Sequence, residues 1–353
     1  MTQTSGLILG VETSCDDTAA AVVDPDGRVL SSVIASQTDI HAAHGGVYPE
    51  LASRAHVQSI IATIDRALGD ACVRGPDLRA IGVTRGPGLI GSLLVGLNTA
   101  TGMGMGWGVP VIGVNHLRGH LRSADLEEKR VTYPAIMLLV SGGHTLLARM
   151  RGPQDIEVLG ATRDDSVGEA YDKVGRMLGL GYPGGPAVDR LAATGAATIR
   201  LPRPLLNDGY AFSFSGLKSA VSRIVTQTPT QLSTQTPTQA PTQAPTQTPA
   251  PNHADIAASF VDACLDVLMT KCRRALMNAP ATSLIVVGGV SASKQLRAQA
   301  AQLCDELGVT LCLPPLRWST DNAAMIALAT WDYLALEAPP KPVAQTRLTV
   351  VDY

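Results

Sequence analysis

The sequence has 353 residues, of which 45% are hydrophobic and only 16% are charged, and this composition excludes a disordered or fibrous chain. The 28 Lys and Arg residues nearly balance the 30 Asp and Glu residues, so the net charge of −2 excludes a global positive field that would attract nucleic acid. None of the six cysteines belongs to a CxxC pair, which favours reduced thiols in the cytoplasm over a disulfide scaffold. The first residues lack the basic start of a signal peptide, and the length predicts two domains at about 150 residues each.

Short apolar strands alternate with helical patterns along the chain. We predict strands at residues 7–11, 19–23, 136–140, 145–150 and 283–287. We predict helices at residues 52–69, 89–105, 166–180, 255–278 and 293–307. A strand–turn–strand pattern occurs near residues 7–23 and again near 136–150, which predicts a duplicated α/β architecture in two domains.

The stretch from Gly86 to Asn115 has no charged side chain and therefore resembles a membrane span. It contains nine glycines and two prolines, and it divides into a helix, a turn and a strand. We therefore predict that this stretch is buried in an α/β core and that the protein has no membrane segment.

Residues 226–252 differ from the rest of the chain in composition, because they repeat Thr-Pro-Thr-Gln and Ala-Pro-Thr-Gln without a charged side chain. Such a segment buries too little apolar surface to offset its own chain entropy. We predict a disordered insertion here, a tolerated expansion of a surface loop rather than a docking segment.

Two histidines four residues apart carry the sharpest chemical signal. On a helix, His116 and His120 would share one face, where both rings can bind one cation, although a chance pair explains this motif equally well. Zinc proteases with this spacing carry a glutamate after the first histidine, and Leu117 stands there instead, so a protease would lack its general base. Asp321 is a candidate third ligand, and two histidines with one carboxylate suit iron, with zinc or manganese as alternatives.

Several turns combine glycine, hydroxyl and acidic residues in ways that suit an anionic ligand. The turn at residues 12–18 packs hydroxyls and carboxylates together, as a phosphate and its cation require. The glycines of Ser141-Gly142-Gly143 and Gly288-Gly289 allow backbone N–H groups to approach a nucleotide closely. Taken singly, each of these motifs is also explained by an ordinary turn.

Nine stretches in chain order resemble one family, the universal tRNA threonylcarbamoyladenosine transferases, long labelled O-sialoglycoprotein endopeptidases. They are GVETSCDDTAAAVV, GGVYPELASRAH, TRGPGLIGSLLVG, VNHLRGH, LLVSGGHT, DDSVGEAYDKVGRMLGLGYPGGP, FSFSGLK, GGVSAS and STDNAAMIA. The resemblance implies an α/β fold of the actin/Hsp70/sugar-kinase type, with two RNase-H-like subdomains around a nucleotide cleft. We expect the first subdomain at residues 1–118 plus 318–353 and the second at 119–317, with the insertion at 226–252.

The resemblance also implies a metal-dependent acyl transfer. A threonylcarbamoyl group would pass from threonylcarbamoyl-AMP to the exocyclic amine of the adenosine 3′ of the anticodon, in tRNAs that read codons beginning with A. By position, His116, His120 and Asp321 would bind one Fe2+ ion per subunit, and Asp16 would orient or deprotonate the attacking amine. The family usually has asparagine in place of Ser293, which would shorten the reach of one hydrogen bond to the adenylate. The residues that would line the adenylate and threonylcarbamoyl site are Leu139, Val140, Ser141, Gly142, Gly143, Asp172, Gly185, Asp189 and Ser293.

The resemblance further implies two protein partners, a degenerate paralogue of the same fold and a P-loop ATPase. We expect tRNA docking to rely on local basic patches such as Lys271, Arg273 and Arg274, or on these partners. Three other classes of protein are weighed against the transferase. A metalloprotease lacks its glutamate, a sugar or acetate kinase on the same fold would not need the histidine pair, and a catalytically silent scaffold would not need a complete set of metal ligands.

Overall fold

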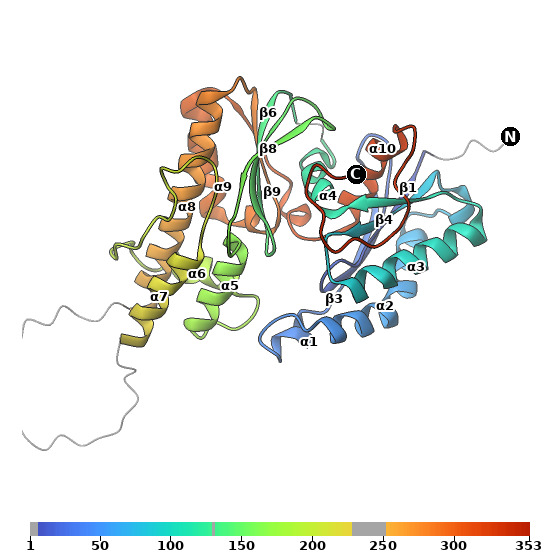
Figure 1. Ribbon diagram of the computed structural model, residues 1–353. Helices are drawn as coiled ribbons and strands as arrows, with labels where there is room; N and C mark the ends of the chain where they lie inside the picture. Colours follow the sequence, from blue (N-terminus) through green and yellow to red (C-terminus); the bar gives the residue numbers. More distant parts are fainter. Residues whose placement is uncertain (1–5, 129–130, 228–251) are drawn as a thin grey trace, which may run out of the picture.

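The computed structural model describes residues 6–128, 131–227 and 252–353. Two five-stranded sheets covered by helices form its framework (Figure 1). The strand order is β3-β2-β1-β4-β5 in the first sheet and β8-β7-β6-β9-β10 in the second. In each sheet the first three strands in sequence pair antiparallel, the fourth pairs parallel with the first, and the fifth pairs parallel with the fourth. The two sheets therefore repeat one topology, as the repeated strand–turn–strand pattern predicts.

The strands and helices have the following bounds. The first sheet contains β1 (Ile8–Glu12), β2 (Asp17–Val23), β3 (Val29–Ser36), β4 (Ala80–Gly86) and β5 (Val111–Asn115). The second sheet contains β6 (Ala135–Val140), β7 (Thr145–Met150), β8 (Ile156–Ala161), β9 (Ser283–Val287) and β10 (Thr310–Cys312). The helices are α1 (Thr38–Ala42), α2 (Pro49–Asp70), α3 (Ile90–Trp107), α4 (His116–Arg122), α5 (Val167–Met177), α6 (Gly184–Ala192), α7 (Ser215–Gln227), α8 (His253–Asn278), α9 (Lys294–Leu307) and α10 (Ala323–Leu334).

The first sheet is buried on both faces, because α2 and α3 cover one face and α10 covers the other. Its central strand β1 is apolar on both sides, so Leu9 packs with α2 and α3 while Ile8 packs with α10. Gly10 allows α10 to approach closely, since a Cβ at this position would lie 2.1 Å from the carbonyl oxygen of Ala323. The start of α10 is therefore held directly over the centre of the sheet.

The second sheet packs one face against α5, α8 and α9 and the other face against α4. Leu117 and Leu121 of α4 contact the second sheet, while Gly119 lies against α10 of the first sheet. The short helix α4 therefore lies between the two halves of the molecule. We propose the division into residues 1–118 plus 318–353 and residues 119–317 on this basis, with its boundary falling inside α4.

The uncharged stretch from Gly86 to Asn115 forms the end of β4, the core helix α3 and the strand β5. In the described part of the chain, no helix combines the length and apolarity that crossing a bilayer requires. At the predicted insertion, α7 ends at Gln227 and Asn252 caps α8 by accepting a hydrogen bond from the backbone N–H of Asp255. Residues 228–251 of the predicted insertion lie outside the described residues.

Candidate functional site

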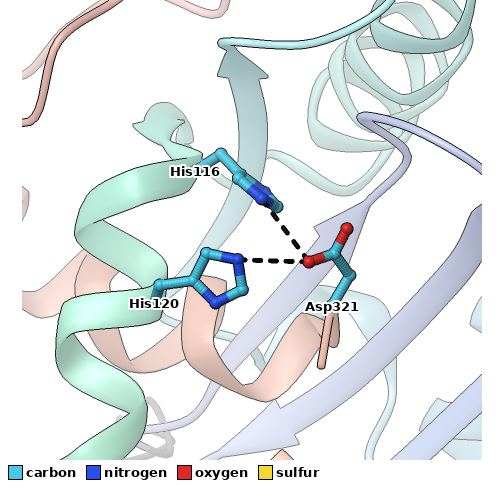
Figure 2. A group of neighbouring side chains, drawn as sticks. All are labelled: His116, His120 and Asp321. Atoms are coloured by element: carbon cyan, nitrogen blue, oxygen red, sulfur yellow. Dashed lines mark ion pairs between the residues drawn. The ribbon is translucent and has the colours of Figure 1, made fainter. Parts of the chain in front are cut away.

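The helix α4 and the turn before α10 bring the three predicted metal ligands together (Figure 2). The helix begins at His116 because the side chain of Asn115 caps it, accepting a hydrogen bond of 2.9 Å from the backbone N–H of Leu117. The Nε2 atoms of His116 and His120 lie 3.5 and 3.2 Å from the same oxygen of Asp321. One ligand atom from each of the three residues lies within 4.8 Å of the other two.

The surroundings of His120 fit a metal site. This residue is 0% exposed, and within residues 6–128, 131–227 and 252–353 its Nδ1 atom has no hydrogen-bond partner, while its Nε2 atom faces Asp321 at 3.2 Å. Ligand atoms about 2.1 Å from one ion, with angles of about 90–110° between them, lie about 3.0–3.4 Å apart. The distance of 3.2 Å from His120 to Asp321 lies within this spacing, and the distance of 3.5 Å from His116 is slightly longer. The three residues therefore fit a divalent transition metal.

Glu12 is a second contact of His116 that the sequence did not single out. Its carboxylate is 1% exposed and lies 2.9 Å from Nδ1 of His116, and it accepts a further hydrogen bond of 2.7 Å from Thr84. A proton on Nδ1 leaves Nε2 of His116 available to a metal. Burial lowers the pKa of His116, but the charges of Glu12 and then Asp321 outweigh burial and raise it to about 9. The position of Glu12 at the end of the apolar strand β1 indicates in the sequence that this carboxylate is buried and needs a partner, because a buried charge is costly without one.

The glycine turns of the second sheet pack against one another. Gly288 has a φ of 92°, and a Cβ there would lie 2.5 Å from the carbonyl oxygen of Val140 at the end of β6. Gly168 at the start of α5 approaches Ser141 equally closely. A Cβ at Gly142 would meet no atom within 4 Å, so the outer side of this turn is open. The turns after β6 and β9 and the start of α5 therefore pack directly against one another, and Gly142 lies on their open side.

The predicted residues Leu139 and Val140 do not present side chains to this surface. Both are 0% exposed, and their side chains belong to the hydrophobic cores on opposite faces of the second sheet. Only their backbone groups are in a position to contact a ligand, as expected for the end of a central strand.

The other predicted site residues lie around the start of α6. One carboxylate oxygen of Asp172 accepts hydrogen bonds from the backbone N–H groups of Gly184 at 2.9 Å and Gly185 at 3.2 Å. Burial raises the pKa of Asp189, against the opposing effect of its contacts with Ser293 and then Tyr171. The Oδ1 atom of Asp189 is buried and has no hydrogen-bond partner among the described residues. A buried acceptor of this kind suits a ligand hydroxyl group.

One hydrogen bond and one electrostatic effect connect these turns with the first half of the molecule. The hydroxyl group of Tyr182 donates a hydrogen bond of 3.2 Å to Asp16 in the turn between β1 and β2. Burial, together with the charges of His116 and then His120, lowers the pKa of His144 to about 4. The turn after β6 therefore lies close to the metal ligands, and Asp16 lies close to the start of α6.

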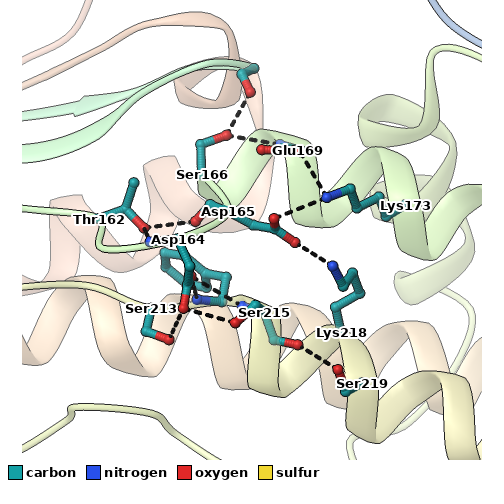
Figure 3. A network of polar contacts seen from close by, with 12 residues as sticks. Thr162, Asp164, Asp165, Ser166, Glu169, Lys173, Ser213, Ser215, Lys218 and Ser219 are labelled. Carbon is teal, nitrogen blue, oxygen red and sulfur yellow. Dashed lines mark hydrogen bonds and ion pairs between the residues drawn. The ribbon is translucent and has the colours of Figure 1, made fainter.

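A polar network fixes the start of α5 behind the glycine turn (Figure 3). The carboxylate of Asp165 pairs with Lys173 of α5 at 2.9 Å and with Lys218 of α7 at 2.7 Å. The hydroxyl group of Ser166 caps α5 and donates a hydrogen bond of 2.5 Å to the carbonyl oxygen of Gly142. The position of the turn at Gly142 therefore depends on the contact between α5 and α7.

Of the basic patch predicted to dock tRNA, Lys271 is not available at the surface, while a docking role of Arg273 and Arg274 stays a prediction. Lys271 is 0% exposed, and its ammonium group donates to three backbone carbonyl groups, those of Leu205, Asp208 and Gly209. Arg274 donates to backbone carbonyl groups of the same loop, and Arg273 pairs with Glu306. Lys271 and Arg274 hold a loop in place, and local charge counting along the sequence could not distinguish this role from a docking surface.

Comparison with known proteins identifies the family. The family model described as TsaD, tRNA N6-adenosine threonylcarbamoyltransferase, matches residues 28–328. The chain belongs to this family. The transferase is 45% identical over 325 residues to the tRNA N6-adenosine threonylcarbamoyltransferase of Bacillus thuringiensis (strain Al Hakam), and the match covers 92% of this chain and 90% of that relative. The predicted activity, transfer of a threonylcarbamoyl group to N6 of a tRNA adenosine, is thereby confirmed over the protease, kinase and scaffold alternatives.

Solved structures confirm the predicted fold class. The transferase is similar to HypF of T. kodakarensis, with a TM-score of 0.61 and 12% identity over 93% of this chain and 47% of that chain. It is also similar to component A of the (R)-2-hydroxyglutaryl-CoA dehydratase of Acidaminococcus fermentans, with a TM-score of 0.52 and 13% identity over 91% and 96% of the two chains. At such low identity these likenesses show only the fold, which is of the actin/Hsp70/sugar-kinase type.

Proposed function

We propose that the transferase uses threonylcarbamoyl-AMP as its donor, with the metal centre at one end of the donor and the glycine turns at the other. The acceptor is the exocyclic amine of the adenosine 3′ of the anticodon, in tRNAs that read codons beginning with A. The observation that carries this proposal is the set of three ligand atoms of His116, His120 and Asp321 within 4.8 Å of one another. The turn after β6 follows Leu139, which shares a core cluster with Leu117 of α4, the helix that carries both histidines.

We propose Fe2+ as the ion, because two histidines and one carboxylate leave open positions for a substrate. Zinc and manganese suit the same three residues. When bound, the ion would hold the threonylcarbamoyl end of the donor and polarise its carbonyl group. Glu12 orients His116 through Nδ1, so that its Nε2 atom faces Asp321.

The turns of the second half hold the adenylate end of the donor. Backbone N–H groups around Gly142 offer hydrogen bonds to the phosphate, while those of Gly184 and Gly185 are already bound to Asp172. The unpartnered oxygen of Asp189 accepts a hydrogen bond from a ribose hydroxyl group, with Ser293 beside it. These contacts orient a donor that is already activated as a mixed anhydride, so the protein supplies positioning and charge stabilisation.

The chemical step requires no covalent enzyme intermediate. The amine nitrogen of the adenosine attacks the carbonyl carbon of the threonylcarbamoyl group, and the bond from that carbon to the phosphate oxygen breaks. AMP leaves, and the proton of the amine passes to the carboxylate of Asp16. Tyr182 orients this carboxylate through its hydrogen bond of 3.2 Å.

We further propose that the transferase acts in the cytoplasm with a degenerate paralogue of its own fold and a P-loop ATPase. Exposed apolar side chains on α2 support a protein partner, since Val57 is 64% exposed and Ile61 is 50% exposed. The net charge of −2 also favours partners that contribute positive charge to tRNA docking.

The test is mass spectrometry of tRNA nucleosides after incubation with threonylcarbamoyl-AMP, Fe2+, the transferase and its proposed partners. Wild-type protein and the control His253→Ala, at an exposed position of α8, are expected to yield threonylcarbamoyladenosine. His116→Ala is expected to lower the yield at least 100-fold while the protein keeps its helical circular dichroism signal. Normal turnover by His116→Ala would contradict the proposed metal role.

A further inference from the structure

The segment Thr349–Tyr353, called the strap here, lies against α4, the helix that carries both histidines (Figure 1). The side-chain amide of Asn115 donates hydrogen bonds to the carbonyl groups of Thr349 at 2.7 Å and Asp352 at 3.0 Å. Nε of Arg118 donates to the carbonyl group of Val350 at 3.1 Å. Two residues that flank His116 in the sequence therefore bind the backbone of the strap.

An aromatic contact adds to these hydrogen bonds. The guanidinium carbon of Arg118 lies 3.8 Å from the ring centroid of Tyr353, and Arg118 is only 4% exposed. At this distance the cation is attracted by the face of the ring, more strongly because the contact is largely shielded from water. Tyr353 also meets Tyr333 of α10 edge to face, and Tyr333 accepts a hydrogen bond from the backbone N–H of Asn115.

The strap also contacts the second half of the molecule. Val350 is 0% exposed and belongs to the same core cluster as Leu117 and Leu121 of α4 and the inner face of the second sheet. The hydroxyl group of Tyr353 donates a hydrogen bond of 3.2 Å to the carbonyl group of Gln154, in the turn between β7 and β8. The strap thus fills the space beside α4 and touches the helices and strands around it.

The helix α4 depends on such contacts for its position. With seven residues it is too short to be stable by itself, so its neighbours determine where its side chains point. Asn115 connects α4 with the strap, because its side-chain oxygen Oδ1 caps α4 while its side-chain NH2 group donates to the strap. Metal sites require ligands held to within about 0.5 Å of their productive geometry, and a shift of α4 would move His116 and His120 relative to Asp321.

We propose that Arg118 and the strap are positioning elements of the metal centre. They hold α4 so that His116 and His120 face Asp321, and disrupting them weakens divalent metal binding and transfer while both sheets stay folded. This inference rests on the proposed metal role of the two histidines. In this proposal neither Arg118 nor Tyr353 binds the metal or the substrate, since both act only through the position of α4.

The experiment measures Co2+ binding to the full, metal-stripped chain by visible absorption and by competition with a chromophoric chelator. Tyr353→Ala and Arg118→Met are expected to weaken Co2+ binding at least tenfold. Tyr353→Phe keeps the ring over Arg118 and removes only the hydroxyl contact with Gln154, so it is expected to stay within twofold of wild type. The control Arg74→Met removes an arginine whose side chain is 81% exposed and is also expected to stay within twofold.

The variants separate a positioning role from a general loss of stability. The proposal is supported if Tyr353→Ala binds Co2+ more weakly while Tyr353→Phe binds it as wild type does. This pair of tyrosine variants tests the positioning role even if Arg118→Met does not fold. Wild-type affinity in Tyr353→Ala, or equal weakening in both tyrosine variants, overturns it. Wild-type Co2+ affinity in His116→Ala would instead remove the proposed metal role of the histidines, on which the inference rests.

Discussion

Glutamine in place of Glu12 is expected to weaken metal binding about 10- to 100-fold, the usual effect of removing the carboxylate partner of a metal-ligating histidine. Glu12 uses both oxygens in the folded protein. One accepts the backbone N–H of Ser14 at 2.5 Å, and the other accepts from Thr84 at 2.7 Å and lies 2.9 Å from Nδ1 of His116. A glutamine amide has a single oxygen, so it cannot reproduce all three contacts.

Each orientation of the amide creates a conflict. If its NH2 group faces Ser14, two donors meet, and one buried donor stays unpaired at a cost of about 1–3 kcal/mol. If its NH2 group faces His116, Nδ1 must become an acceptor, which moves the imidazole proton to Nε2, the atom that faces Asp321. The first conflict is present with and without the metal, so it lowers the stability of the protein rather than its metal affinity. The second places a proton on the atom that would bind the metal, and each 1.4 kcal/mol of its cost lowers the affinity about tenfold.

The assay is a titration of metal-stripped protein with Co2+ in the presence of a competing chelator, with thermal unfolding of the metal-free protein in parallel. Glu157→Gln is the matched control, because that carboxylate is 45% exposed and pairs with Arg149 at the surface. An affinity of the Glu12→Gln variant within twofold of wild type would refute the assigned role of Glu12.

Three further substitutions test other parts of the structure. Burial raises the pKa of Asp17 from 3.8 to about 6, so the folded state binds the proton of this carboxyl group more tightly than the unfolded state. Protonated Asp17 therefore stabilises the fold at low pH, and this contribution is lost as pH rises from about 4 through 6. Asp17→Asn should therefore raise the free energy of unfolding by at most about 3 kcal/mol near pH 7 and by much less near pH 4, and equal gains in urea unfolding at both pH values would contradict this. Ser166→Ala removes the cap of α5 and the hydrogen bond to the carbonyl oxygen of Gly142. We therefore expect the free energy of unfolding to fall by about 1 kcal/mol and the KM for the donor to rise several-fold, while Ser166→Thr should keep both values near wild type. Tyr182→Phe removes a hydrogen bond to the Asp16 carboxylate, and steady-state kinetics should show kcat lowered about tenfold, whereas an unchanged kcat would exclude a role for Tyr182 in orienting Asp16.

Local patterns along the sequence determined the main helices and the strands β1, β2, β6, β7 and β9, but not the central strand β4. The predicted helix at residues 255–278 appears as α8 (His253–Asn278), and the predicted strand at 283–287 coincides with β9. Apolar periodicity and capping residues are properties of neighbouring positions, so they can be recognised without the fold. The same applies to the family, because nine short stretches in the expected order are a property of the chain itself.

Elements without a local pattern were missed. The edge strands β3 and β8 are only partly buried, so apolar and polar residues alternate poorly along them. The helix α10 is apolar around most of its surface, so its sequence lacks the 3.6-residue hydrophobic period that distinguishes a helix. Gly10 shows why α10 is nevertheless fixed in place, because the absence of a side chain allows it to approach β1.

Only the tertiary structure decided how the site is assembled. The resemblance implied His116, His120 and Asp321 as ligands, but their meeting depends on the packing of α4 against α10 and the second sheet. The contact of Glu12 with His116, the strap on α4 and the burial of Lys271 join residues far apart in the chain. Such contacts have no periodic signature, because they arise when separate elements pack together and buried polar groups must find partners.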